Sequence, residues 1–591
     1  AHAEREFYRG DVDLYFSLFG DHHIRAGFDH EETTYNNFGS RNGAGAGGGK
    51  LGQNWVYRKN LTSVVSSQGF APGEEWVELR TFDGGGSYGG VNKAIYIQDS
   101  WDITDRLSLN LGFRRDQFLL KDDQGRAFSE FDNEKAARVG FTWDPTGEKK
   151  DKVFGFYGRY YLPVAANTAY RAASNNLDVR QYFRPVSGTT FTVDPVTGLP
   201  VGGLGPIVTR VTNPTFTALG ICQQLYIDRG IVPVAAGTRA CNVGSSGETP
   251  PPESISALNV KSTMEDEYIL GYERRFNSLW KAGVTLTYRT LQRAADDTSI
   301  DAAVVAYCKA NGIAGCEDIW SGLHQYLIVN PGLDVVAVLS DPLPGETQIR
   351  TLTLKASDLG LPKVKREYVA LEFKFERAFD GKWGLQGSYV LSESKGNFEG
   401  AVKSDTGQAD AGITSDFDTP GFIPGTYGLL PNHHAHQFKL FGSYAITDNF
   451  LIGGNASVVS PRHYGCQGLV PTSLFPDTAG PSNTYAPLPA HYCQGKLAPR
   501  GASMEGDWIK RFDLSLRYTV PEKILPAGNL VLRADVFNLF NFKGAQELYE
   551  VGDLVGGGVD PNYGKPGATS GTVGSGYQTP RYVRVGFDLQ F

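Results

Sequence analysis

Hydrophobic and polar side chains alternate strictly at the end of the chain, over residues 581–591. The apolar positions are Val583, Val585, Phe587, Leu589 and Phe591. A period of two predicts a β-strand with one apolar and one polar face. An 11-residue strand is longer than most strands of soluble proteins and is long enough to cross a bilayer at a tilt. The pattern therefore indicates a membrane-spanning strand.

The same alternation recurs along the chain, mostly in pairs that predict hairpins. We expect about 17 strands in all. They cover residues 11–19, 22–31, 51–61, 74–82, 91–101, 107–118, 133–143, 152–162, 263–276, 281–293, 365–377, 383–397, 433–445, 450–460, 508–520, 529–542 and 581–591.

Short and long connections alternate between these strands. The long ones include residues 163–262, 294–364, 398–432, 461–507 and 543–579. Bacterial outer-membrane barrels have short periplasmic turns and long extracellular loops. We therefore predict an all-β fold, a transmembrane antiparallel β-barrel with long extracellular loops, embedded in the lipid of the cell outer membrane.

Composition agrees with a barrel rather than a helical protein. Aromatic residues make up 12 % of the chain, and it contains 72 Gly but only 2 Met. We find no long segment with a helical period and no run of 18 apolar residues, so an α-helical span is not expected. The net charge of −8 is spread along the chain, which argues against a nucleic-acid partner.

The six cysteines fall into three local pairs, each within a long loop. We predict disulfides Cys222–Cys241, Cys308–Cys316 and Cys466–Cys493, because an even count in local pairs is typical of an oxidising compartment. None of the pairs has the CxxC spacing of a zinc site. The first ten residues contain no apolar signal-peptide core, so we expect the mature N-terminus upstream or the chain to be a fragment.

Several stretches resemble the TonB-dependent receptors. The terminal strand ending in Phe591 is similar to the C-terminal signature of outer-membrane barrels, in which the last Phe is the signal for insertion. IQDSWDITDRLSLN (97–110) and DVFNLFN (535–541) resemble strand signatures of the receptors themselves. Segments similar to the Oar-like subgroup are FGDHHIRAGFDHE (19–31), EDEYILGYERRF (265–276), YVLSESKGNFEG (389–400), DAGITSDFD (410–418) and LPNHHAHQFKLFGSY (430–444).

The resemblance implies a 22-stranded barrel and an N-terminal plug with a TonB box, neither of which is complete in residues 1–591. We therefore expect these residues to form the C-terminal portion of the receptor barrel, with the plug and the first strands upstream. The implied function is TonB-dependent uptake of an unidentified ligand, with the TonB complex acting through the plug. The alternative is an Oar-like surface scaffold or protein-export barrel that binds a partner protein through its loops.

Two side-chain groups are candidates for metal binding. His433, His434 and His436 are adjacent, but successive strand residues point to opposite faces, so we favour a solvated strand start. The acidic cluster could bind calcium but lacks the spacing of a known calcium loop, so we favour a solvated external loop. Its members are Asp405, Asp410, Asp416 and Asp418, with a weaker group at Asp296, Asp297 and Asp301. We predict no metal or cofactor.

Charged residues on the polar strand faces should line the lumen, where they most simply pair with one another. They are Glu372, Lys374, Glu376, Asp513, Arg517, Arg533, Asp535, Arg584 and Asp588. Aromatic residues near strand ends suit an interfacial girdle. They are Trp101, Tyr160, Trp383, Tyr444, Trp508 and Tyr518. No catalytic motif such as GxSxG or HExxH is present, so we expect no enzyme and no catalytic residue.

Overall fold

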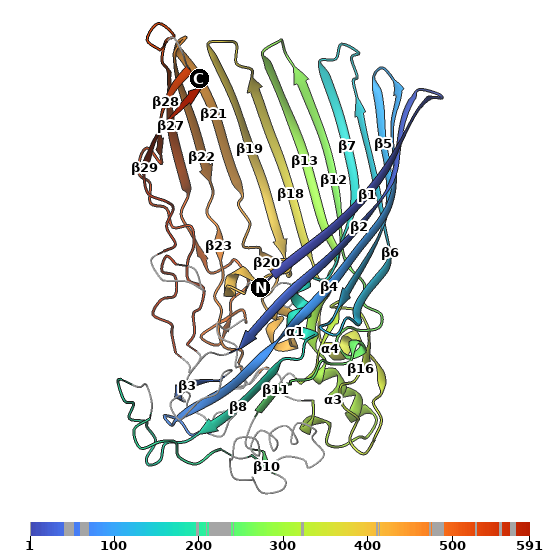
Figure 1. Cartoon of the computed structure of the whole chain (residues 1–591), viewed down its shortest axis with the longest axis vertical. Helices are drawn as coiled ribbons and strands as arrows, with labels where there is room; N and C mark the ends of the chain where they lie inside the picture. Colours follow the sequence, from blue (N-terminus) through green and yellow to red (C-terminus); the bar gives the residue numbers. More distant parts are fainter. Residues whose placement is uncertain are drawn as a thin grey trace.

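The computed structural model is dominated by one large antiparallel sheet that curls into a barrel wall, with the loops gathered at one end (Figure 1). It describes residues 2–590 except 41–52, 60–69, 197–199, 209, 212–237, 240–241, 321–323, 409–411, 413, 472–473, 475–489, 526–528, 555–557 and 568–574. The sheet contains 19 strands. Four of them, β3, β8, β11 and β20, lie on the loop side, and the other fifteen form the wall.

Each wall strand pairs with the next one along the chain, apart from the loop-side strands inserted between them. The wall strands are β1 (His2–Ser17), β2 (Asp21–Ser40), β4 (Glu75–Thr104), β5 (Leu107–Lys121), β6 (Ala127–Trp143), β7 (Asp151–Leu162), β12 (Thr263–Arg275), β13 (Trp280–Arg293), β18 (Arg366–Arg377), β19 (Trp383–Gly396), β21 (His436–Thr447), β22 (Phe450–Val459), β27 (Ile509–Thr519), β28 (Asn529–Phe537) and β29 (Tyr582–Gln590). The loop-side strands are β3 (Gln53–Lys59), β8 (Leu177–Phe183), β11 (Asn242–Ser246) and β20 (Gly428–Leu429).

The first half of the wall differs from the predicted strand order. The segments predicted as two strands at 74–82 and 91–101 are one continuous strand, β4, which also includes residues 83–90 between them. Its glycines hide the alternation, and one of them is required for close packing. Gly85 has φ +120°, and a Cβ there would lie 2.2 Å from the Asn37 carbonyl oxygen on β2. The connection between β5 and β6 is also shorter than expected, at residues 122–126.

The two faces of the wall have the polarity of a membrane barrel. Large apolar side chains are exposed on the outward face, including Val585 and Phe587 of β29, which are 76 % and 70 % exposed. Cross-strand neighbours share this outward face, as Leu270 of β12 and Leu286 of β13 do. Polar side chains occupy the opposite face. An apolar exterior around a polar interior is the arrangement that lipid requires.

The long loops fold into small elements of their own beyond the wall (Figure 1). Paired short strands are β9 (Arg210–Val211) with β10 (Thr238–Arg239), β14 (Asp296–Ser299) with β15 (Tyr326–Val329), β16 (Val335–Val338) with β17 (Thr351–Leu354), β23 (His463–Tyr464) with β26 (Met504–Glu505), and β24 (Tyr492–Cys493) with β25 (Lys496–Leu497). Helical segments are α1 (Ala166–Ala172), α3 (Asp301–Ala310) and α4 (Ala356–Leu359), with 3-10 turns η1 (Pro252–Ser254), η2 (Cys316–Asp318), η3 (Ser404–Thr406), η4 (Ser415–Phe417) and η5 (Pro420–Phe422).

The sheet is not closed within the described residues. There β1 pairs only with β2, and β29 pairs only with β28, so each has one free edge. Across the same described ranges, no helix combines the length and the apolar composition needed to cross a membrane.

Candidate functional site

Charged side chains on the inner face pair along the wall, as predicted. Arg584 Nη2 lies 2.8 Å from Asp535 Oδ2, and Arg533 pairs with Asp588. Towards the middle of the sheet, Lys281 Nζ lies 2.8 Å from Glu376 Oε2. Lys374 similarly contacts Glu273, and Arg511 contacts Asp513. The wall therefore offers a polar surface whose charges largely neutralise one another.

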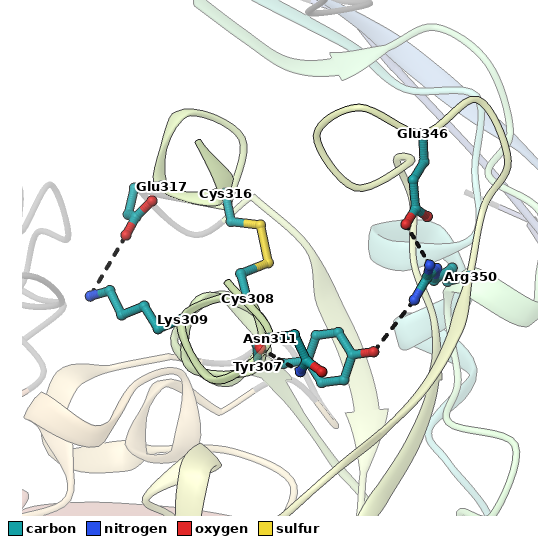
Figure 2. Close-up of a disulfide and its surroundings, with 8 residues drawn as sticks. All are labelled: Tyr307, Cys308, Lys309, Asn311, Cys316, Glu317, Glu346 and Arg350. Carbon is teal, nitrogen blue, oxygen red and sulfur yellow. Dashed lines mark hydrogen bonds and ion pairs between the residues drawn. A yellow bond between two sulfur atoms is a disulfide. The ribbon is translucent and has the colours of Figure 1, made fainter. Parts of the chain in front are cut away.

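The insert between β13 and β18 has a hydrophobic core of its own. Trp320, Ile300 and Leu327 are almost completely buried in it, together with both cysteines of one predicted disulfide. Cys308 at the end of α3 is joined to Cys316, with Cα atoms 6.4 Å apart (Figure 2). A loop with a packed core and a disulfide presents a preformed surface rather than an adaptable one.

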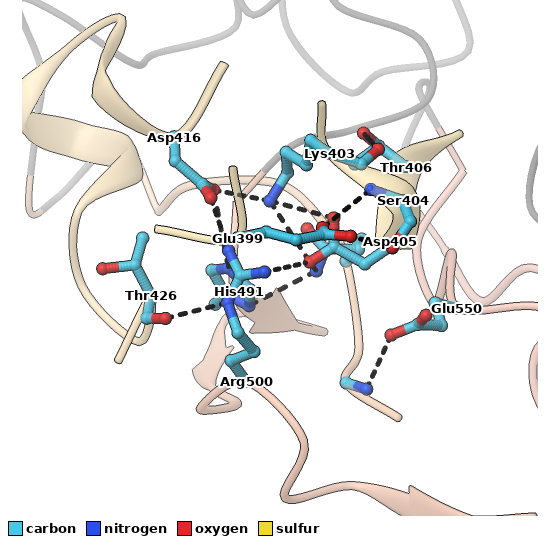
Figure 3. Close-up of polar contacts among 12 residues, drawn as sticks. Glu399, Lys403, Ser404, Asp405, Thr406, Asp416, Thr426, His491, Arg500 and Glu550 are labelled. Atoms are coloured by element: carbon cyan, nitrogen blue, oxygen red, sulfur yellow. Dashed lines mark hydrogen bonds and ion pairs between the residues drawn. The ribbon is translucent and has the colours of Figure 1, made fainter. Parts of the chain in front are cut away.

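A buried ionic cluster holds two other loops together. Arg500 donates to Asp416, and its Nη1 lies 3.2 Å from Asp405 Oδ2 (Figure 3). Lys403 Nζ lies 3.1 Å from Asp405 Oδ1 and 2.5 Å from Asp416 Oδ1. His491 completes the cluster, with Nε2 3.7 Å from Asp416 Oδ1. We call Lys403, Asp405, Asp416, His491 and Arg500 the loop clamp.

The loop clamp connects segments that are far apart in the sequence. Lys403, Asp405 and Asp416 follow β19, whereas His491 and Arg500 follow β22. The connection after β28 joins the same region, because backbone Gln467 N donates to Glu550 O at 2.8 Å. The second disulfide, Cys466–Cys493, closes the loop after β22, with Cα atoms 5.6 Å apart.

Burial and charge act in opposite directions on the acids of the loop clamp. Burial by itself raises the pKa of Asp416, but the Arg500 and Lys403 cations outweigh it and hold the pKa below its usual value. The pKa of Asp405 is also lowered, since Lys403 and Arg500 again outweigh burial. Burial, with Lys403 nearby, lowers the pKa of His491 to about 4, so this imidazole is neutral at pH 7.

The expectation that the acidic cluster is a solvated external loop is wrong. Asp405, Asp416 and Asp418 are all at most 4 % exposed, because loops distant in the sequence cover them. Two of the three carboxylates are already neutralised by the cations of the loop clamp. Asp410 lies outside the described residues.

Asp296 and Asp301 of the weaker acidic group are also buried, and the group does not form one site. Asp296 accepts a hydrogen bond from Thr414 N at 3.0 Å, and burial raises its pKa to about 7. Asp301 instead accepts from His324 N and Gln325 N, at 2.6 and 3.1 Å, near the start of α3. Among the described residues, no group of three or more His, Cys, Asp or Glu side chains could hold a metal ion.

The three clustered histidines point to different partners. His433 is buried, not solvated as expected, and its Nδ1 accepts from Ser394 N at 3.2 Å. His434 Nδ1 lies 2.7 Å from Ser460 O, and His436 Nδ1 lies 2.8 Å from the Tyr389 hydroxyl. Their ring nitrogens are used to fix the entry to β21.

The predicted aromatic girdle is present in part. Trp101, Trp383, Tyr444 and Tyr518 lie at the end of the wall with the short turns, and Trp508 lies at the loop end. Tyr160 does not belong to the girdle. Its ring packs under Arg138 on the inner face, 4.9 Å from the guanidinium carbon, because it falls on the polar side of β7. Cys222, Cys241 and Phe591 lie outside the described residues.

Sequence comparison relates the first wall strands to a family of known proteins. The model of the family "TonB dependent receptor-like, beta-barrel" matches residues 3–199. Over 530 residues the chain is 24 % identical to the TonB-dependent transporter Oar of Myxococcus xanthus. This alignment covers 84 % of the chain and 42 % of Oar. The chain is thus similar to TonB-dependent receptor barrels, and to Oar among them. It therefore lies in the outer membrane, with its apolar face in contact with lipid.

Solved structures of outer-membrane proteins also match this chain, at low sequence identity. The siderophore receptor PiuA from Acinetobacter baumannii matches with a TM-score of 0.46 and 11 % identity, over 99 % of this chain and 56 % of PiuA. The outer membrane transporter YddB from Escherichia coli matches with a TM-score of 0.47 and 12 % identity, over 100 % of this chain and 54 % of YddB. The chain thus spans about half the length, or less, of the relatives that it matches.

Proposed function

We propose that this barrel takes up a ligand from outside the cell, with the loops capturing it and the polar interior providing its path. Energy reaches the barrel from the TonB complex through a plug domain. The observation that carries the proposal is the match of the first wall strands to the TonB-dependent barrel family, in a chain similar to Oar over most of its length. The ion pairs of the inner wall support it, because they offer a polar but nearly neutral surface to a passing solute.

The shape of the loop region supports capture by a preformed surface. One loop is stabilised by its own core and a disulfide, and two others are joined through the loop clamp. Loops that are already ordered lose little conformational entropy when a ligand binds. The ligand of such a receptor should therefore fit one fixed shape, rather than induce a shape of its own.

We also propose that further strands and a plug complete this barrel. The free edges of β1 and β29 support this, because a strand edge facing lipid leaves backbone N–H and C=O groups without hydrogen bonds. The receptor portion described by residues 1–591 is then the C-terminal part of the wall.

The proposal can be tested by growth on defined nutrient sources. Cells that lack the receptor and cells that lack TonB should lose growth on the same source, among sets of siderophores, peptides and glycans. The accumulation of that labelled source should fall to the level of passive leakage in both strains. If the receptor deletion instead removes a protein from the culture medium and affects no uptake, the barrel serves export.

A further inference from the structure

The second disulfide is in contact with a loop that contains neither of its cysteines. Cys466 and Cys493 both follow β22, and their Cα atoms are 5.6 Å apart. The loop after β28 packs on this bond at Gly552, where a Cβ would lie 2.2 Å from Cys466 Sγ and 2.9 Å from Cys493 Sγ. Only a residue without a side chain fits so close to the two sulfurs. We call residues 551–554 and 558–560 the loop tip.

Backbone hydrogen bonds hold the loop tip beside the first cysteine. Gly552 N donates to Gln467 O at 2.8 Å, and Gln467 N donates to Glu550 O at 2.8 Å, as in a short parallel pair of strands. Asp560 N donates to Gly552 O at 2.8 Å and closes the tip on itself. The tip is thus paired with the chain on one side of the disulfide.

One buried carboxylate connects the loop tip to both sides of the disulfide. Asp553 Oδ2 accepts a hydrogen bond from Leu469 N at 3.0 Å, and its Oδ1 accepts one from Gln494 N at 2.9 Å. Leu469 is three residues after Cys466, and Gln494 directly follows Cys493. Asp553 is only 4 % exposed, and a carboxylate buried to this degree needs such donors. The disulfide sets the distance between them.

Breaking the disulfide changes the space under the loop tip. Two bonded sulfurs are about 2.0 Å apart, whereas non-bonded heavy atoms stay about 3.5–4.0 Å apart. The sulfurs must therefore separate when the bond is reduced, and Gly552 is packed against both of them. Their separation also frees Leu469 and Gln494 from the spacing at which one carboxylate can bind both.

The base of the same loop has contacts of its own. Arg462 Nη1 lies 2.5 Å from Glu547 Oε2, and Gln578 N donates to Gly544 O at 2.9 Å. All four residues are outside the segment that the disulfide closes, which runs from residue 466 to residue 493. Loss of the bond should therefore leave the base of the loop in place.

Cys493 is the more accessible of the two cysteines. It is partly exposed, whereas Cys466 is completely buried. A thiolate of an external dithiol can attack Cys493 Sγ, so that the bond between the sulfurs breaks and Cys466 leaves as a thiolate. The second thiol of the reductant then displaces Cys493. The protein gains two electrons and two protons, and the dithiol becomes a disulfide.

We propose that Cys466–Cys493 is a redox-sensitive latch for the loop tip. The intact bond holds Gly552 and Asp553 in place, and its reduction by a dithiol releases the tip while the base of the loop stays attached. The bond between Cys308 and Cys316 differs, because it lies in the core of a single insert. The inference concerns the loops alone and does not depend on which ligand the receptor takes up.

The test measures hydrogen exchange in the complete receptor, in mild detergent, before and after treatment with dithiothreitol. Mass mapping shows which disulfides are reduced. We expect the amides of Leu469, Gln494 and Gly552 to exchange about tenfold faster after reduction, because each loses its acceptor. The amide of Gln578, in the base of the loop, should keep its rate. Cys466→Ser/Cys493→Ser should show the fast rates without any reductant.

Gly552→Ala tests the latch without removing a cysteine. Its methyl group would overlap Cys466 Sγ, so the amides of Leu469 and Gln494 should exchange fast in the oxidised protein and change little on reduction. Cys308→Ser/Cys316→Ser is the matched control, and it should leave the response to dithiothreitol unchanged.

Three results would overturn the proposal. The amides of Leu469 and Gln494 could stay protected after reduction, which would show that the bond does not hold the tip. The amide of Gln578 could accelerate equally, which would show that the bond supports the whole loop. The disulfide of the folded receptor could also resist dithiothreitol at a concentration that reduces the unfolded chain.

Discussion

Arg500 donates to Asp416 in a site that solvent does not reach, and the two residues are only 3 % and 2 % exposed. They come from different loops, so their contact joins the segment after β19 to the segment after β22. A buried ion pair contributes little net stability compared with apolar residues of the same shape, but removing one partner leaves a buried charge. The contact therefore fixes which loops lie together.

Arg500→Met should destabilise the loop region by about 3–5 kcal/mol, because Asp405 and Asp416 would lose a buried cation. Trypsin cleavage of the loops in intact cells would report the loss, while gel mobility would show the wall still folded. Arg350→Met is the control, since its pair with Glu346 is on the surface and should contribute at most about 1 kcal/mol. Equal protease resistance of the two variants would contradict the role of the loop clamp.

Acidification should loosen the loop region through His491. Its pKa is about 4 in the folded loops and near 6.5 in an unfolded chain, so the unfolded state binds the proton more readily. The contribution of neutral His491 to the stability of the loop region is therefore complete above pH 6.5. It is lost as the pH falls towards 4, by about 3 kcal/mol in total. Asp416 has a lowered pKa, so its contribution is lost only below the unfolded value near 3.8. The pH dependence of hydrogen exchange in the loops measures this effect.

His491→Gln should flatten the pH dependence between 6.5 and 4, because the replacement cannot take up a proton. The control is His2→Gln, an exposed histidine at the start of β1. If the pH dependence of hydrogen exchange in the loops stays steep in His491→Gln, then another group causes the loss of stability.

The cysteines should be found as disulfides in the native protein. Peptide mapping without reduction should recover Cys308–Cys316 and Cys466–Cys493, and we also predict Cys222–Cys241. Cys308→Ala/Cys316→Ala should lower the stability of the α3 region by about 2–3 kcal/mol, because the bond closes a short loop. Free thiols in the oxidised protein at any of these positions would count against the predicted placement of the loops outside the cell.

A charge should be tolerated on one face of the wall and not on the other. Leu270→Arg places a cation in lipid at mid-wall and should cost about 2–4 kcal/mol. Thr287→Arg, on the neighbouring strand but facing the interior, should be close to neutral. Urea unfolding in lipid vesicles compares the two. The wall would have the wrong orientation if Thr287→Arg were the more harmful change.

Alternation predicts the wall well wherever side chains distinguish its two faces. The hairpin expected at 263–276 and 281–293 is found as β12 and β13 with nearly the same limits, because Tyr268, Leu270 and Leu286 mark the outward face. The method fails at Gly84, Gly85 and Gly86, which have no side chain to show a face and were left outside the predicted strands. These glycines are extended because they pair with β2, and the local sequence carries no information about that pairing.

The candidate site was less predictable than the wall. The two cysteines of each pair are close in the sequence, so their spacing predicts which cysteines are joined. The loop clamp, in contrast, joins Asp405 to Arg500 across almost a hundred residues, and nothing in either segment indicates that the other will bury it. Lys403 gave no signal at all, although it is 1 % exposed and holds two carboxylates. Burial of charge depends on tertiary packing that local patterns do not encode.

The length of β4 bears on where the receptor first meets its surroundings. Its 30 residues span on the order of 100 Å at the usual rise, whereas the hydrocarbon layer is only about 30 Å thick. Even with tilt, a large part of β4 stands beyond the bilayer among the sugar chains of the cell surface. A bulky molecule, an antibody or a phage can thus touch this sheet at a height where the membrane itself is still out of reach.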